Sequence, residues 1–285
     1  MKKALSLMTA AALVLSLAAC GSTASSAASS EAASPEAASS DAASSEAASS
    51  EAASETETAE LSTVEPGKLI MSTNAAFPPY EMTTDSGEFE GIDIETAQAI
   101  ADKLGLELQI DDMDFDAALL SVQQGKADIV MAGVTVTDER KAVMDFSDSY
   151  ATGIQSIIVP NDSDIASPDD LAGKTIGTQR GTTGYIYCSD DFGDENVVAY
   201  DDGLTAVQAL NNGQVDAVVI DNAPAQEFVA ANPGLKVLDT SYAEEDYAIG
   251  MAKGSALEDA VNKALEELKA DGTLQAIVDK YINAN

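Results

Sequence analysis

The sequence predicts an α/β protein of two similar lobes, which follow an export signal and a long polar segment. Two observations predict this fold. A helix, a glycine and a strand are indicated in turn over residues 118–130, and a matching run occurs over residues 206–218. Other segments of the same part of the chain have apolar residues at helical spacing or in alternation, as in proteins whose helices cover sheets.

Residues 1–20 have the pattern of an export signal. Lys2 and Lys3 precede an apolar run of about 14 residues, shorter than the roughly 20 needed to span a bilayer. The run ends in Leu-Ala-Ala-Cys-Gly, which resembles the lipobox of bacterial lipoproteins, where the cysteine becomes the first mature residue and carries acyl chains. Lipidation of Cys20 would hold the chain on the outer face of the cytoplasmic membrane. The alternative is an ordinary secretory signal with an incidental cysteine.

Residues 21–64 are expected to form a flexible acidic tether. They are almost entirely Ser, Ala, Thr and Glu, with an acidic residue at every fifth position from 31 to 51. A period of five fits neither helix nor strand, and a segment without large apolar residues cannot offset its ordering entropy. As a coil, such a tether has an end-to-end distance of roughly 35–40 Å.

The folded part is expected to begin near Pro66. Residues 68–73 predict a strand, residues 94–104 predict a helix that Gly105 ends, and residues 106–110 predict a second strand. In each copy of the repeat, a glycine, Gly125 or Gly213, stands where helices end in the left-handed conformation. We interpret the repeat as one helix–turn–strand unit in each lobe, although any α/β protein contains such units.

The composition excludes several functions. With 14 basic against 49 acidic side chains, the chain has no footprint for nucleic acid. It contains no histidine, which removes Ser–His–Asp and Cys–His catalysis and most catalytic zinc sites. No spacing of side chains indicates a cofactor or metal site. If Cys20 is lipidated, the other cysteine, Cys188, has no partner and is expected to be a small buried hydrophobe.

Polar residues follow the predicted strands, where α/β sheets bind ligands. The first repeat strand leads to Thr135 and Arg140, and the second leads to Asp221. A third predicted strand, 174–178, leads to a Gly-Thr-Thr turn at residues 181–183. Arginine clamps carboxylates and aspartate accepts from ammonium groups, so these segments suit a ligand that carries both charges.

These residues resemble the polar amino-acid class, family 3, of extracellular solute-binding proteins of ABC importers. The resemblance covers about residues 66–285 and depends on a series of motifs in one order. They include Asn-Ala-Ala-Phe-Pro-Pro-Tyr-Glu at 74–81, Gly-Ile-Asp-Ile-Glu at 91–95, Thr-Val-Thr-Asp-Glu-Arg at 135–140, Asp-Phe-Ser-Asp at 145–148, Gly-Thr-Thr at 181–183 and Val-Asp-Ala-Val-Val-Ile-Asp at 215–221.

The resemblance implies the type II periplasmic-binding-protein-like fold. Each lobe would be a mixed sheet flanked by helices, with the ligand in the cleft between them. Lobe 1 would comprise residues 66–152 and 248–285, and lobe 2 residues 153–247.

The resemblance also implies roles for ten residues. Arg140 would bind the α-carboxylate of an amino acid, and Asp221 its α-ammonium group. The other expected contacts are Thr135, Thr182 and Thr183 for the carboxylate, Gly133 and again Thr135 for the ammonium group, and Asn74, Phe77, Tyr80 and Phe115 around the side chain. Simpler interpretations exist for some: Asp221 could be a helix N-cap, and Phe77 and Phe115 ordinary core residues.

The side chain of the ligand is expected to be polar, neutral or acidic. Relatives that bind cationic amino acids commonly have Asp where this chain has Asn74, which argues against lysine or arginine. Arg180 decides between the remaining classes: if it faces the cleft, glutamate is favoured, and if it faces outward, a neutral ligand such as glutamine is favoured. We favour a neutral polar ligand.

The function expected from these features is capture of a free L-amino acid for an ABC permease and its ATPase, by a monomeric protein that is not an enzyme. Two alternatives remain. A small-carboxylate lyase or dehydratase can share this fold, and a ligand-sensing protein could act through a separate receptor.

Overall fold

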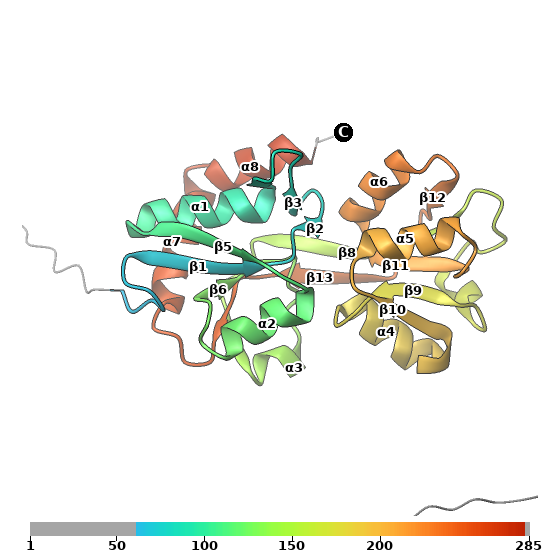
Figure 1. The fold of residues 1–285 in the computed structure, drawn as a ribbon, viewed down its shortest axis with the longest axis horizontal. Coiled ribbons are helices and arrows are strands. Elements are labelled where there is room, and N and C mark those ends of the chain that lie inside the picture. Colours follow the sequence, from blue (N-terminus) through green and yellow to red (C-terminus); the bar gives the residue numbers. More distant parts are fainter. Residues whose placement is uncertain (1–60, 283–285) are drawn as a thin grey trace, which may run out of the picture. The chain divides into compact units, whose positions relative to one another are not determined.

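The computed structural model describes residues 61–282 (Figure 1). The predicted signal segment with Cys20, and residues 21–60 of the predicted tether, lie outside the described residues. In the described part, helices flank two large sheets, one in each lobe, and a small three-stranded sheet accompanies the first. The predicted α/β fold with two lobes is therefore confirmed.

Lobe 1 is built on a five-stranded mixed sheet in the order β5-β1-β6-β14-β7. Strand β1 is parallel to β5 and β6, and β14 is antiparallel to β6 and β7. The strands are β1 (Lys68–Thr73), β5 (Glu107–Asp112), β6 (Ile129–Val130), β7 (Met144–Phe146) and β14 (Gly250–Ala252), and the small sheet has β2 (Ala76–Phe77), β3 (Glu81–Thr83) and β4 (Phe89–Glu90).

The alternation of side chains along β1 explains how helices cover both faces of this sheet. Leu69 and Met71 pack in one apolar cluster with α1, α7 and α8, and Ile70 packs in another with α2. The helices of this lobe are α1 (Ile92–Leu104), α2 (Phe115–Gln123), α3 (Asp138–Lys141), α7 (Glu258–Ala270) and α8 (Thr273–Tyr281). As predicted, α1 ends at Gly105, which has a φ of 70°.

Lobe 2 is built on a sheet in the order β10-β9-β11-β8-β12, with β13 also paired to β8. Helices α5 and α6 cover one face and α4 the other, where Cys188 is fully buried as expected. The elements are β8 (Ala151–Pro160), β9 (Ile176–Gln179), β10 (Val197–Tyr200), β11 (Ala217–Asp221), β12 (Leu235–Val237), β13 (Ala243–Tyr247), α4 (Thr183–Phe192), α5 (Gly203–Asn211), α6 (Asn222–Ala231) and the 3₁₀ turns Pro168–Leu171 and Asp194–Asn196.

Two antiparallel strands, β8 and β13, carry the chain between the lobes (Figure 1). Strand β8 begins at Ala151 and β13 ends at Tyr247, and these two residues are paired. The strands of the first sheet fall within residues 68–146 and 250–252, and those of the second within 151–247. The precise lobe boundaries given above remain a prediction.

The internal repeat has the expected structure. Helix α2, Gly125 and β6 form the first copy, and α5, Gly213 and β11 form the second. Both glycines have positive φ, 64° and 66°, which a residue with a side chain adopts only with strain.

Each copy also contains an aspartate with the same structural role. The Asp128 carboxylate accepts from the Ile70 N–H at 2.8 Å, and the Asp128 N–H donates to the Ile70 carbonyl. In lobe 2, Asp216 makes the same pair of hydrogen bonds with Thr175, again at 2.8 Å. Each aspartate thus ties its helix–strand unit to the neighbouring strand.

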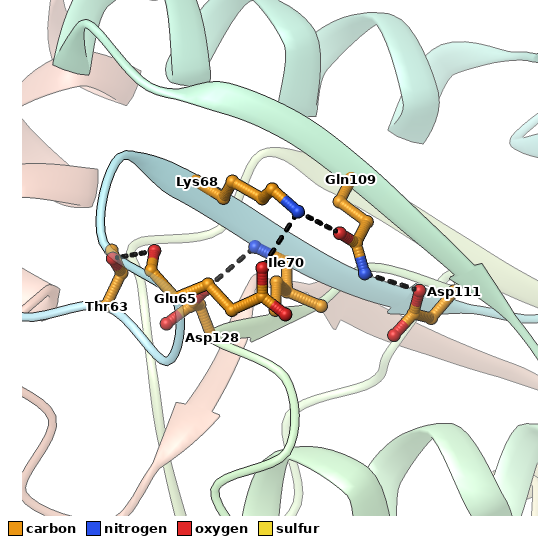
Figure 2. A network of polar contacts seen from close by, with 7 residues as sticks. All are labelled: Thr63, Glu65, Lys68, Ile70, Gln109, Asp111 and Asp128. Atoms are coloured by element: carbon orange, nitrogen blue, oxygen red, sulfur yellow. Dashed lines mark hydrogen bonds and ion pairs between the residues drawn. The ribbon is translucent and has the colours of Figure 1, made fainter.

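Asp128 holds the beginning of the folded part as well, an arrangement that we call the Asp128 clasp. Its second carboxylate oxygen accepts from the Val64 N–H at 2.7 Å, and Leu61 packs against the lobe 1 core. Figure 2 shows this region, where Lys68 bridges Glu65 and Gln109 at 2.8 and 3.0 Å. Residues 61–64, placed by the sequence in the tether, are therefore attached to lobe 1.

None of the helices in residues 61–282 has the length and apolar character that crossing a membrane requires.

Candidate functional site

A pocket lies between the lobes, where the strands of both sheets end. It contains about 440 Å³ of space between atoms, part of it open to solvent. Nine of the ten residues predicted to bind a ligand line this one pocket: Asn74, Phe77, Phe115, Gly133, Thr135, Arg140, Thr182, Thr183 and Asp221. The tenth, Tyr80, does not line it but packs behind the wall, with its ring 5.8 Å from that of Phe77.

Arg140 is held in the pocket with its charge largely buried. It lies in the short helix α3, which Thr137 caps, and its side chain is 8% exposed. The guanidinium donates to the Thr135 carbonyl at 2.7 Å and to the Gly181 carbonyl of lobe 2 at 3.2 Å, and it lies over the Phe115 ring. Burial lowers the pKa of this guanidinium, which arginine nevertheless keeps charged. Its other N–H groups remain to bind an anion.

Asp221 faces the pocket from lobe 2, at the end of β11. Its Oδ2 atom accepts from the Ile154 N–H at 2.8 Å and from the Tyr247 hydroxyl at 2.7 Å. Its Oδ1 atom accepts from the Ala223 N–H and caps α6, so Asp221 is a helix N-cap that also lines the pocket. Burial raises the pKa of this carboxyl from 3.8 to about 6, although its hydrogen bonds favour the ionised form.

Hydroxyl and backbone groups complete the polar wall. Thr182 caps the N-terminus of α4, which points N–H groups toward the same side as Arg140, and Thr183 is its first residue. The Thr135 hydroxyl lies 3.4 Å from that of Thr183 across the two lobes. Gly133 has a φ of 54°, and a Cβ atom there would lie 2.8 Å from Phe77, so only glycine fits this position.

Asn74 has both ends of its amide engaged within the protein. Its NH₂ group donates to the Met113 carbonyl at 2.9 Å, and its oxygen accepts from the Gln179 NH₂ group of lobe 2 at 2.8 Å. Asn74 therefore links the lobes directly as well as lining the pocket.

Several pocket residues were not predicted from the sequence. They are Glu81, Gln155, Gln179 and Tyr247, together with the apolar Ala132, Val219 and Ile220. Tyr247 and Gln155 lie on the crossover strands β13 and β8, whose pairing joins segments about 90 residues apart. Glu81, Val219 and Ile220 had a signal in the sequence, because they lie in the motifs at residues 74–81 and 215–221.

Glu81 is the most unusual group in the wall. It is fully buried, and neither carboxyl oxygen has a hydrogen-bond partner among the described residues. Burial, together with the nearby Asp93 and Asp112, raises the pKa of this carboxyl well above its usual value. A protonated Glu81 can donate to Asp93, and its other carboxyl oxygen can still accept a hydrogen bond.

Arg180 faces away from the pocket. Its side chain is 52% exposed and lies 3.5 Å from Asp201, and it donates to the Ala199 carbonyl. Of the two arginines in the chain, only Arg140 therefore contributes to the pocket.

The site thus combines a buried cation from lobe 1 and a buried carboxyl from lobe 2 in one pocket. A small zwitterion is complementary to such an arrangement. Sequence comparison agrees with this class. Residues 69–284 match the bacterial extracellular solute-binding proteins, family 3, and the chain belongs to that family.

Its relatives include the L-cystine-binding protein TcyJ of Escherichia coli K12, 33% identical over 225 residues that make up 78% of this chain and 85% of the relative. The arginine-binding extracellular protein ArtP of Bacillus subtilis is 34% identical over 75% of this chain and 86% of its own length.

Solved structures of similar proteins agree with this family. The arginine-, lysine-, histidine-binding protein ArtJ of Geobacillus stearothermophilus has a TM-score of 0.73 and 34% identity, covering 76% of this chain and 96% of its own. An ancestral arginine-binding protein bound to glutamine has a TM-score of 0.73 and 41% identity, covering 76% and 99%. The family and these relatives are substrate-binding proteins and not enzymes, so this chain is a binding protein, as expected.

Proposed function

We propose that this chain binds a free L-amino acid in the cleft and delivers it to the permease of an ABC transporter, which an ATPase drives. The observation that carries the proposal is that Arg140 and Asp221, from opposite lobes, line one pocket. Each is buried, so the charges of a ligand would meet them with little screening by water.

In this proposal the α-carboxylate binds the free N–H groups of Arg140 and the N-terminus of α4. The α-ammonium group binds Asp221, the Gly133 carbonyl and the Thr135 hydroxyl. Since Arg140 belongs to lobe 1 and Asp221 to lobe 2, one ligand would hold both lobes, and its binding would favour the closed arrangement.

We also propose that the bound side chain is polar and donates hydrogen bonds. An acidic side chain is disfavoured, because Arg180 faces outward and the pocket wall already contains the buried carboxyl of Glu81. The raised pKa of Glu81 favours its protonated form, which suits a neutral partner such as the carboxamide of glutamine. A neutral polar ligand therefore remains our first expectation.

A cationic ligand is the competing candidate, because an ionised Glu81 would pair with it. Relatives are named for binding arginine and histidine, and the ancestral arginine-binding protein is described with arginine and with glutamine.

The first experiment is a thermal-shift screen of the purified protein with the twenty amino acids. A ligand that binds only the folded state raises the melting temperature. Calorimetry then gives Kd for glutamine, arginine, histidine, cystine and glutamate. We expect glutamine to bind more tightly than arginine, and glutamate to bind weakly or not at all.

The two arginines provide a matched pair of variants. Arg140→Met should weaken binding at least 30-fold, because a buried charge-assisted contact is worth about 2 kcal/mol or more. Arg180→Met, which changes the same charge outside the pocket, should stay within twofold of the parent protein. Stabilisation by no amino acid, or equal effects of the two substitutions, would reject the proposed function.

We further propose that the protein is exported, lipidated on Cys20 and anchored to the outer face of the cytoplasmic membrane as a monomer. The support is the lipobox-like segment at residues 17–21. Cys20→Ser should move the protein from the membrane to the soluble fraction, whereas Cys188→Ala should not. Light scattering on the soluble protein would report its oligomeric state.

A further inference from the structure

Glu245 is a buried carboxylate next to the pocket to which the proposed binding mode gives no role. It lies on the crossover strand β13 and is 6% exposed. Its Oε2 atom accepts from the Thr135 hydroxyl and from the Gln155 NH₂ group, each at 3.0 Å. Its Oε1 atom is buried without a hydrogen-bond partner among residues 61–282.

These contacts fix the direction of the Thr135 hydroxyl. The Thr135 hydroxyl donates to the Glu245 Oε2 atom, and a hydroxyl has only one hydrogen to donate. The lone pairs of that hydroxyl are then left to accept, and Thr135 lines the pocket. A hydroxyl held in this way can bind a donor such as an ammonium group, but it cannot donate to a carboxylate.

Gln155 is oriented by the same group. Its NH₂ group donates to Glu245. Its oxygen faces Gly184, and a Cβ atom added to Gly184 would lie 2.9 Å from that oxygen. Two polar residues of the pocket, one from lobe 1 and one from a crossover strand, therefore depend on one carboxylate outside the lining.

The geometry points to Glu245 as a positioning residue, which holds Thr135 as an acceptor for the α-ammonium group of the ligand. This inference rests on the proposed function. It predicts that Glu245 helps the pocket to distinguish an amino acid from the matching 2-hydroxy acid, which has no ammonium group.

Two substitutions separate the hydrogen bond from the charge. Glu245→Gln removes the charge but can still present an oxygen to Thr135, whereas Glu245→Met removes both. We expect Glu245→Met to weaken amino-acid binding about tenfold and Glu245→Gln to stay within about threefold. Glu244→Met, on the same strand but exposed, is the matched control and should not change Kd.

A double-mutant cycle tests whether Glu245 acts through Thr135. In a Thr135→Val protein, Glu245→Met should weaken binding by no more than about twofold. Calorimetry with the amino acid and its 2-hydroxy analogue should show that Glu245→Met reduces the preference for the amino acid, which a general loss of packing would not do.

Equal losses in Glu245→Gln and Glu245→Met would overturn the inference, because Glu245 would then act by its charge. A tenfold loss from Glu245→Met that persists in Thr135→Val would also overturn it. If Glu245→Met does not fold, Glu245→Ala replaces it in the same cycle, and a tenfold loss that persists in Thr135→Val again rejects the inference. A parent protein that binds no amino acid would reject the proposed function instead.

Discussion

Lowering the pH from 7.5 to 5 should weaken ligand binding while it stabilises the unliganded protein. The effect on binding comes from Asp221, and the effect on stability comes from Asp221 and Asp93 together. The buried carboxyl of Asp221 has a pKa of about 6 without ligand, and an ammonium group bound beside it would favour the ionised form. Binding below pH 6 must therefore first remove a proton.

The size of the effect follows from that pKa. When only the ionised carboxyl binds, Kd increases by the factor 1 + 10^(pKa − pH), which is about 11 at pH 5 and about 1 at pH 7.5. The Kd of a neutral ligand such as glutamine should thus increase about tenfold between pH 7.5 and pH 5. The Kd of a cationic ligand that also needs Glu81 ionised should increase more. Because the pKa of Glu81 is raised, this ligand must displace a second proton when it binds.

The stability of the unliganded protein should change in the opposite direction. The pKa values of Asp93 and Asp221 both rise from 3.8 to about 6 because of burial. Between these values the folded state binds more protons than the unfolded state, so the free energy of unfolding decreases as the pH rises. Above pH 6 each carboxyl lowers it by up to about 3 kcal/mol.

Calorimetry at pH 7.5, 6 and 5 measures Kd, and two buffers of different ionisation enthalpy count the protons released. Asp221→Asn should bind weakly with little dependence on pH. Asp93→Asn should keep the full dependence, because Asp93 bonds the Gly133 N–H and the Tyr150 hydroxyl and does not line the pocket. A Kd that stays constant from pH 7.5 to 5 would refute the reasoning.

Two further predictions concern the lobe contacts. Gln179→Leu removes the hydrogen bond to Asn74, so all ligands should bind about fivefold more weakly by calorimetry; a changed ligand ranking would instead indicate a side-chain contact. Gly153→Ala would place a Cβ atom 2.5 Å from the Tyr247 ring and 2.7 Å from Asp221, which should cost about 1–3 kcal/mol. Thermal unfolding would measure it, and an unchanged melting temperature would contradict the packing described.

The charged ends of the site could be found from the sequence because of where they lie in the chain. Asp221 directly ends a strand of the repeat, and Arg140 follows the other repeat strand and is one of only two arginines. The two repeat strands belong to different sheets, so the local pattern showed only that a polar residue follows each strand, and the family resemblance supplied the expectation that both residues line one cleft.

The local pattern did not predict the burial of Glu81 and Glu245 or the contact of Asn74 with lobe 2. Glu81 and Glu245 are two of 49 acidic residues, and nothing in their local pattern indicates that they are buried. Their environment is set by contacts between distant segments, as when Glu245 meets Thr135, 110 residues away. Asn74 was assigned to the side-chain pocket, and its bond to the opposite lobe depends on how the lobes meet.

The Asp128 clasp determines where a pull on the N-terminal side of the chain would act. Tension transmitted to Val64 reaches lobe 1 at the start of β1, about 20 Å along the strand from Asn74 and the pocket. Within residues 61–282 the backbone reaches lobe 2 only through β8 and β13, so a pull at Val64 is applied to lobe 1 and not directly to lobe 2. A pull from the N-terminal side therefore acts on the end of the lobe 1 sheet that is remote from the pocket.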